Sequence, residues 1–178
     1  MPISHPRIRE IATKVIVEKP FNNVLDIGVG YGFYGKFIKS QNPSANVYGI
    51  EIYPKYITDQ LDYYKTIFLC NAKDFEYDLL KNKIDLVIAA DVIEHFNKEE
   101  ATILLKKLMN LFPRGVITMP VNVIKDGVIY FEAPLKEHEN KHEIHQSSWT
   151  IDELTGLGLT YRGGGDLTLL IACFEWNC

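Results

Sequence analysis

The chain has 178 residues, 47% of them hydrophobic and 24% charged, a composition that excludes a disordered or fibrous protein and allows one substantial core. Its formal net charge of −4 disfavours a broad nucleic-acid-binding surface, although a local basic groove would be compatible with it. The three cysteines lack C-x-x-C spacing, which favours a reducing compartment. No signal peptide or membrane-length apolar run is evident, so we expect a soluble cytoplasmic protein without a membrane span.

Strand-like and helix-like segments alternate along the first two thirds of the chain. Apolar residues at helical spacing predict a first helix over 6–17, which Pro20 ends. The run 84–90 is almost continuously apolar, as expected of a strand covered on both faces. The other expected strands are 24–28, 47–51, 66–70 and 115–119, and the other expected helices are 34–40, 54–61 and 97–112, with weaker helical character over 75–80.

The alternation stops between 121 and 149, a polar, histidine-rich stretch whose length indicates a functional loop. A short strand over 128–131 is expected inside it. A capping-box pattern then predicts a helix opening at Thr150. Residues 159–174 predict a hairpin, with Gly163–Asp166 between its two arms. Together these segments predict a single doubly wound α/β domain over 1–178, with a mostly parallel sheet and an antiparallel C-terminal hairpin.

The most informative stretch is the turn after the first expected strand, which has the alternating pattern Asp26, Gly28, Gly30 and Gly32. Glycines at a strand–loop–helix junction let a ligand approach the backbone beside a helix N-terminus. A dinucleotide fingerprint would need a further glycine where Phe33 stands. An acid before the first glycine would repel a pyrophosphate but suits a cationic ligand. The pattern resembles motif I of the class I methyltransferases that use S-adenosylmethionine (SAM), which carries an ammonium and a sulfonium and no phosphate.

The resemblance implies a Rossmann-like, seven-stranded sheet with SAM bound beyond the carboxyl ends of its strands. Asp26 and the three glycines would shape the site of the methionine end. Glu51, followed by Ile52, ends the second strand and would hold the ribose hydroxyls, although a solvated strand-end acid is the alternative. Asn71 and Ala72 would meet the adenine at the end of the third strand, where the family usually has Asp-Ala.

The segment 91–95, Asp-Val-Ile-Glu-His, follows the fourth expected strand. It resembles a branch of the family that includes ubiquinone-pathway O-methyltransferases and small-RNA terminal-ribose methyltransferases. In those two groups an acid, a Glu and a His can hold a divalent metal that polarises the accepting hydroxyl. The RNA enzymes add a histidine four residues before a Trp-Thr pair, and His145 has this spacing here.

The resemblance therefore implies that Glu94, His95 and His145 act in catalysis and hold Mg²⁺ or Mn²⁺. Asp91 would join them if its side chain, shorter than the Glu of the metal-binding members, reaches the ion. The alternative is that Glu94 and His95 only pack or cap this loop. Asp91 and Val92 are expected to line the cofactor site in either case.

Residues 138–142 also match H-E-x-x-H, the zinc-protease motif, which needs an amphipathic helix to aim both histidines at one metal. The segment follows Pro134 and is charged almost throughout. A loop over the cofactor is favoured instead, with His142 or His145 as a general base. Three aromatic residues of the stretch are expected either in a lid or in the core: Tyr130, Phe131 and Trp149.

These features predict transfer of the SAM methyl group to an acceptor. A hydroxyl oxygen is favoured, because no Asn-Pro-Pro-Tyr-like tetrapeptide of the amino-methylating nucleic-acid enzymes follows the fourth strand. The expected acceptor is a small molecule or the terminal ribose of an RNA, and the oligomeric state stays open. A non-catalytic SAM-binding or partner-binding module of the same fold is the alternative.

Overall fold

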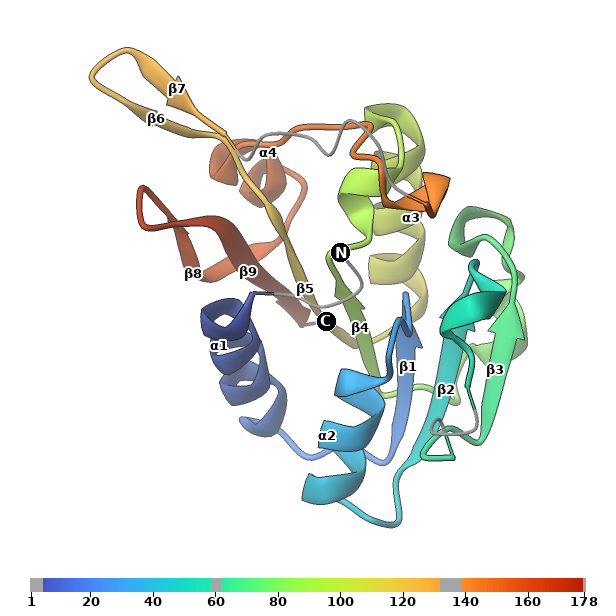
Figure 1. The fold of residues 1–178 in the computed structure, drawn as a ribbon. Helices are drawn as coiled ribbons and strands as arrows, with labels where there is room; N and C mark the ends of the chain where they lie inside the picture. Colours follow the sequence, from blue (N-terminus) through green and yellow to red (C-terminus); the bar gives the residue numbers. More distant parts are fainter. Residues whose placement is uncertain (1–4, 59–61, 132–138, 178) are drawn as a thin grey trace.

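The computed structural model describes residues 5–58, 62–131 and 139–177, which are built around a seven-stranded sheet (Figure 1). Its strands are β1 (Asn23–Ile27), β2 (Asn46–Glu51), β3 (Thr66–Leu69), β4 (Leu86–Ala90), β5 (Arg114–Pro120), β8 (Thr160–Asp166) and β9 (Leu169–Asn177). They lie in the order β3-β2-β1-β4-β5-β9-β8. Strands β1 to β5 pair in parallel, whereas β9 is antiparallel to both of its neighbours. The predicted fold class is confirmed.

Helices cover both faces of this sheet. The helices α1 (Pro6–Val17) and α2 (Phe33–Gln41) pack on one face, and α3 (Lys98–Leu111) and α4 (Ile151–Gly156) on the other (Figure 1). Successive side chains of a strand point to opposite faces of the sheet. Val24 of β1 therefore packs with α1 and α2, and Leu25 packs with α3 and α4. Among the described residues, no helix has both the length and the apolar character to cross a lipid bilayer.

Short 3₁₀ turns form several of the connections between strands and helices. They are η1 (Pro54–Tyr56), η2 (Ala72–Asp74), η3 (Tyr77–Leu80), η4 (Ile93–His95) and η5 (Lys141–Glu143). The helix expected over 54–61 is therefore wrong within its described part. Only η1 forms, because Ile57 is already extended and the rings of Tyr53 and Tyr56 pack edge to face, 4.9 Å apart, across this turn.

The glycines of the C-terminal hairpin lie in a strand and not in the turn between its arms. Gly164 has a φ of +81° inside β8, and a Cβ at this position would lie 2.2 Å from the carbonyl oxygen of Ile171. The actual turn begins at Asp166, whose Oδ1 accepts hydrogen bonds from the backbone N–H groups of Thr168 and Leu169. The glycines thus allow a bulged, close approach of β8 to β9.

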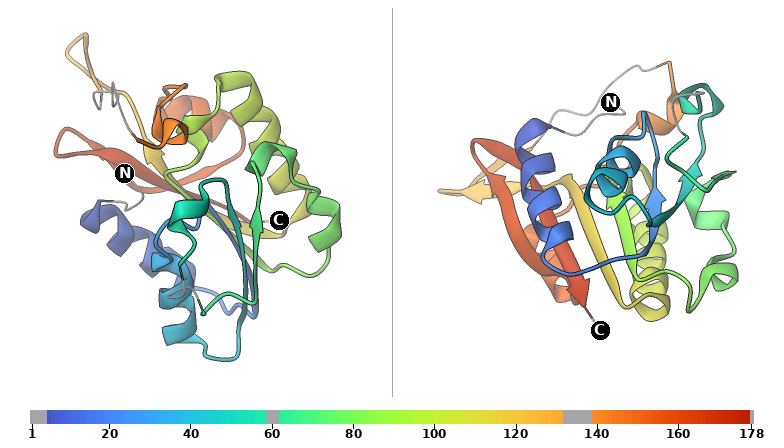
Figure 2. Two further views of the ribbon diagram at one scale, coloured as in Figure 1. Left: turned by 45° about the vertical axis from the view of Figure 1, so that its right-hand side comes forward. Right: turned by 90° about the horizontal axis from the view of Figure 1, so that it is seen from below.

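The stretch after β5 forms a second hairpin, β6 (Val123–Lys125) and β7 (Val128–Tyr130), which projects from the body of the molecule (Figures 1 and 2). The strand expected over 128–131 is confirmed. Tyr130 and Phe131 are exposed on this arm. Trp149, in contrast, is 2% exposed and belongs to the core. Residues 132–138 of the expected acceptor loop lie outside the described residues.

Gly115 of β5 offers a test of this packing. A Cβ at Gly115 would lie 1.9 Å from the ring of Trp176, its cross-strand partner in β9. We expect Gly115→Ala to lower the free energy of unfolding by about 1–3 kcal/mol, as overpacked cores do. Gly156→Ala is the control, because its Cβ would have no heavy atom within 4 Å. Urea denaturation followed by tryptophan fluorescence measures both, and equal stability of the two variants would contradict the packing.

Candidate functional site

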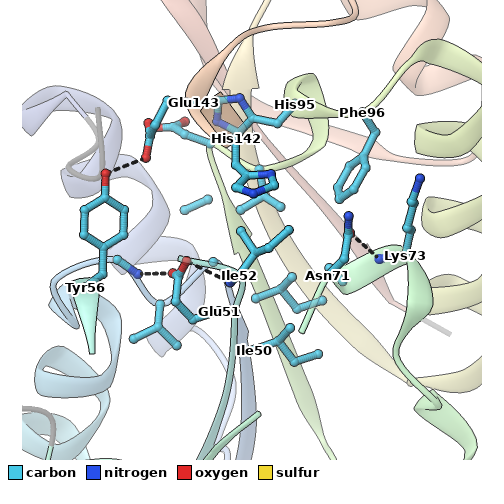
Figure 3. Close-up of a pocket in the computed structure, with 18 of the residues that line it drawn as sticks. Ile50, Glu51, Ile52, Tyr56, Asn71, Lys73, His95, Phe96, His142 and Glu143 are labelled. Carbon is cyan, nitrogen blue, oxygen red and sulfur yellow. Dashed lines mark hydrogen bonds between the residues drawn. The ribbon is translucent and has the colours of Figure 1, made fainter. Parts of the chain in front are cut away.

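A cavity of about 310 Å³ lies beyond the carboxyl ends of β1 to β4 (Figure 3). The order of strands changes direction between β1 and β4, and open α/β sheets bind ligands beside such a point. Nine of the residues predicted for the site line the cavity: Gly28, Gly30, Glu51, Ile52, Asn71, Ala72, Asp91, Val92 and His95.

The glycine turn brings the backbone of β1 against the loop after β4. Gly28 has a φ of +77°, and a Cβ at this position would lie 2.4 Å from a methyl carbon of Val92. Gly32, with a φ of +76°, is the N-cap of α2 and gives this helix no side-chain cap. Gly32 does not itself line the cavity. The positive φ angles explain why the turn needs glycine, and they leave the first turn of α2 beside the cavity.

The position of Asp26 differs from the prediction. Its carboxyl is 1% exposed and does not line the cavity. The hydroxyl of Tyr64 donates a 2.5 Å hydrogen bond to Asp26, and also accepts one from the backbone N–H of Gly35. Burial raises the pKa of Asp26 to about 8, against the lowering effect of the Tyr64 hydrogen bond. Asp26 therefore anchors the packing behind the glycine turn, because strand alternation turns its side chain toward Tyr64.

Glu51 places a nearly buried carboxylate in the cavity wall. Its Oε2 accepts a hydrogen bond from the N–H of Gly30 at 2.8 Å, and its Oε1 accepts from the N–H groups of Ile52 and Tyr53 (Figure 3). Burial raises the pKa of Glu51, and these backbone hydrogen bonds oppose that shift. The carboxylate thus ties the glycine turn to the end of β2 while facing the cavity.

Asn71 and Lys73 form the part of the cavity wall that follows β3. The side-chain oxygen of Asn71 accepts a hydrogen bond from the N–H of Lys73 at 3.1 Å (Figure 3). The two side-chain N–H donors of Asn71 have no acceptor among the described residues and can meet a ligand. The Nζ of Lys73 lies 2.6 Å from a carboxylate oxygen of Glu100 on α3. Both members of this ion pair line the cavity.

Glu94, His95 and His145 meet although 50 residues separate the first two from the third. One ligand atom of each lies within 4.8 Å of the others, and the two imidazole centroids are 5.2 Å apart. The loop of His145 is held by backbone contacts, since the N–H groups of Gln146 and Ser147 both donate to the carbonyl of Glu94. The structure therefore brings together the three residues that were predicted as a catalytic and metal-binding group.

Asp91 is not part of this group. It has a φ of +54°, and its Oδ1 accepts a 2.9 Å hydrogen bond from the hydroxyl of Thr118 on β5. Its backbone N–H also donates to the carbonyl of Thr118. Asp91 lines the cavity, but its side chain is directed to β5. Among the described residues, the group whose ligand atoms all lie within 4.8 Å of one another contains Glu94, His95 and His145 and does not include Asp91.

Partial burial of His95, with a further effect of the neighbouring His145, lowers its pKa to about 4. The imidazole is therefore neutral near pH 7. His142 also lines the cavity, from the single turn η5. His138, the other histidine of the H-E-x-x-H match, lies outside the described residues.

Sequence reasoning missed residues that reach the site from distant parts of the chain. Arg9 of α1 lines the cavity. Tyr56 does so too, and its hydroxyl donates a 3.0 Å hydrogen bond to the buried Glu143 (Figure 3). Tyr64 lies behind the glycine turn. None belongs to a local pattern, because each acquires its place only through packing.

A family model described as a methyltransferase domain matches residues 24–115, more than half of the chain. This chain belongs to the class I SAM-dependent methyltransferases. The matched part of this methyltransferase begins with β1 and the glycine turn and extends into β5. A search of the curated proteins found no significant sequence match.

Solved structures resemble the methyltransferase over nearly its whole length. The N-terminal domain of EvdMO1 with S-adenosylhomocysteine (SAH) bound has a TM-score of 0.71 and 12% identity, over 99% of this chain and 82% of that one. The small RNA methyltransferase HEN1 has a TM-score of 0.64 and 15% identity, over 99% of this chain and 26% of that one. A protein of Nostoc punctiforme PCC 73102 assigned as an O-methyltransferase has a TM-score of 0.64 and 14% identity, over 96% of this chain and 56% of that one. The chain thus spans little more than half of one relative and a quarter of another, and these likenesses show the fold.

The lining of the cavity fits SAM, the cofactor of the family. Glycine at position 28 lets the end of β1 pack directly against Val92, and the Gly28 backbone lines the cavity. The buried Glu51 carboxylate lines the cavity, and each of its oxygens can accept a further hydrogen bond of the kind a ribose hydroxyl donates. The N–H donors of Asn71 can meet the edge of a base.

The buried Asp26 predicts a particular dependence of stability on pH. Its pKa in the folded protein, about 8, lies above its ordinary value of 3.8, so the folded state keeps a proton that the unfolded chain loses. The contribution of Asp26 to the free energy of unfolding is therefore fully present below about pH 4 and declines as the pH rises through about 8. Asp26→Asn should gain stability over wild type as pH increases. Urea denaturation at several pH values measures this, and a constant difference between the two proteins would contradict it.

Proposed function

We propose that this protein is a SAM-dependent O-methyltransferase that acts, as one domain over residues 1–178, on a hydroxyl of a small molecule or of a terminal ribose. The observation that carries the proposal is the meeting of Glu94, His95 and His145 beside a cavity that fits SAM. Such a group can activate a hydroxyl, whose oxygen must lose its proton to be methylated. The similarity to an assigned O-methyltransferase supports a hydroxyl acceptor, and the similarity to the small RNA methyltransferase HEN1 supports an RNA as one class of substrate.

The walls of the cavity would position the two reactants. Glu51 would accept hydrogen bonds from the ribose hydroxyls, and Asn71 and Ala72 would meet the adenine. The glycine turn would receive the methionine end. When bound, SAM would supply a methyl group that an acceptor oxygen can attack, with the C–S bond breaking and the thioether SAH as the leaving group. The contribution of the protein is then to hold the acceptor in line and to remove its proton.

The histidines would accept the proton that the acceptor hydroxyl loses. The Nδ1 of His95 lies 3.4 Å from the carbonyl oxygen of Ile144. A proton on Nδ1 satisfies that carbonyl and leaves a lone pair on Nε2. His95 or His145 would take the hydroxyl proton directly if no metal is used. The loop 139–147, which contributes His142, Glu143 and Gln146 to the lining, would cover the acceptor and exclude water.

A metal is the second element of the proposal. One carboxylate and two imidazoles within 4.8 Å of one another form a donor set with mixed oxygen and nitrogen ligands. Glu94, His95 and His145 would hold Mg²⁺ or Mn²⁺, with positions left for substrate oxygens. The ion would act as a Lewis acid that lowers the pKa of the acceptor hydroxyl.

Replacement of Glu51 tests the cofactor site. Glu51→Gln keeps the size of the side chain but removes the charged acceptor, so SAH binding should weaken by about 1.5–3 kcal/mol, the range for hydrogen bonds to charged groups. Glu99→Gln, exposed at the start of α3, is the control and should bind SAH like wild type. Isothermal titration calorimetry measures each affinity. Wild-type affinity in a folded Glu51→Gln variant would refute the ribose assignment.

Chelation tests the metal and the catalytic group. With radiolabelled SAM and hydroxyl-bearing extracts, we expect excess chelator to stop methyl transfer and added Mg²⁺ or Mn²⁺ to restore it. His145→Ala should slow turnover by about 100-fold while SAH affinity stays close to wild type. Lys141→Ala, exposed on the same loop, is the control.

The outcomes of this experiment separate the parts of the proposal. Full activity in excess chelator would exclude the metal and leave the histidines as bases. Lack of transfer to every pool, in a protein that binds SAH, would favour the non-catalytic module.

A further inference from the structure

We infer that the projecting hairpin β6–β7 carries a self-association surface, where one of its faces packs against the same face of a second copy of this chain. The inference does not depend on the proposed SAM site. Five large apolar side chains of the hairpin are between 39% and 63% exposed: Ile124, Val128, Ile129, Tyr130 and Phe131. None of them packs into the core on either side of the seven-stranded sheet. A contiguous group of exposed apolar side chains marks an interaction surface.

One face of the hairpin is entirely apolar. Ile124 lies opposite Ile129 across the two strands, so these two side chains are on the same face. Phe131, two positions after Ile129, falls on this face by strand alternation. These three residues, which we call the apolar face, are each more than half exposed. Within the described part of the chain, the apolar face therefore has no cover.

The opposite face of the hairpin is suited to water. It carries two cross-strand pairs, Val123 with Tyr130 and Lys125 with Val128. Lys125 gives this face a charge and Tyr130 gives it a hydroxyl, while Val123 is already partly covered. A hairpin with one polar and one apolar face has the pattern of strands that bury a single face. The apolar face is thus the one that a partner would cover.

The hairpin needs a second layer for its own stability. Within the described residues, β6 and β7 pair with each other and with no further strand. An isolated two-stranded hairpin is at best marginally stable in water. Its turn is well formed, since Asp126 and Gly127 have φ angles of +50° and +76°, the conformation of a tight two-residue hairpin turn. The backbone therefore presents the apolar face as a preformed surface.

An identical face is the cover that fits these side chains. Two stacked sheets interdigitate their inner side chains, and a two-fold axis through the pair Ile124–Ile129 would set both isoleucines of one copy against those of the other. The contact buries no charge, although each chain has a formal net charge of −4. A lipid surface suits the hairpin less, because Lys125 and Asp126 at its tip would have to enter the bilayer first.

The exposed area sets the strength of this association. At roughly 100 Å² for each of the five exposed side chains, which is about half of what a buried aromatic residue covers, two hairpins would bury at most about 1,000 Å². This area is at the lower limit for a specific complex and far below that of obligate dimers. We therefore expect a dimer with a dissociation constant in the micromolar range, in exchange with a folded monomer.

Sedimentation equilibrium of the full chain, from low micromolar concentration upward, measures the association. Wild type should shift from monomer to dimer. Ile129→Lys places an unpaired charge in the contact and should raise the dissociation constant by roughly 100-fold or more. Val128→Lys is the matched control and should associate like wild type, because Val128 is exposed to a similar degree on the opposite face of the same strand. Circular dichroism at low concentration should show the same unfolding temperature for both variants, since each lies outside the core.

The other outcomes would overturn the inference in distinct ways. A wild type that stays monomeric up to its solubility limit would exclude the pairing, and binding of that monomer to phosphatidylcholine vesicles would assign the hairpin to a lipid surface instead. Equal losses in Ile129→Lys and Val128→Lys would exclude the apolar face as the contact. Assembly beyond two copies would exclude a closed contact about a two-fold axis.

Discussion

The carboxylate of Glu51 is buried at the end of β2, where its oxygens accept hydrogen bonds from three backbone N–H groups. One of these N–H groups lies in the glycine turn. Burial of a charge in this way costs free energy, which the hydrogen bonds partly offset. The turn after β1 is thereby fixed relative to β2. The packing of Gly28 against Val92, the start of α2 and the contact between Phe33 and Arg9 all depend on the same turn.

The site as a whole concentrates buried acids, which the core of a small domain does not need for stability. Asp26, Glu51, Glu94 and Glu143 are all at most 7% exposed. Two of them, Asp26 and Glu51, have pKa values raised by burial. Apolar residues would be more stabilising at the positions of Glu51, Glu94 and Glu143, so the acids there fit a surface that meets hydroxyls and cations. Asp26 is the exception, because its side chain is directed to Tyr64 and not to the cavity.

The proposed acceptor side is assembled differently from the cofactor side. The cofactor contacts follow individual strands, and each comes from a short segment that ends at the same edge of the sheet. The proposed catalytic group forms only because His145, 50 positions after His95 in the chain, lies beside η4. Its loop is held there by hydrogen bonds to the carbonyl oxygen of Glu94. In the chain, the projecting hairpin β6–β7 lies between Glu94 and His145.

The sequence by itself predicted most of the elements and the class of ligand, but the helix expected over 54–61 was wrong within its described part. Its glycine spacing, its apolar runs and the caps at Asn97 and Thr150 predicted the sheet, the main helices and a SAM site, because these patterns act through local backbone geometry. The spacing of His145 before a Trp-Thr pair predicted its meeting with Glu94 and His95 only through resemblance to a family.

Only the tertiary structure decided which side chains face the cavity. It directed Asp26 to Tyr64 and Asp91 to Thr118, and it brought Arg9 from α1 to the glycine turn. It also placed the glycines near the C-terminus within β8 instead of in a turn. These outcomes depend on contacts between residues far apart in the chain, whose directions are fixed by strand alternation and packing. A local pattern carries no record of such contacts, and this is the physical reason why the sequence left them open.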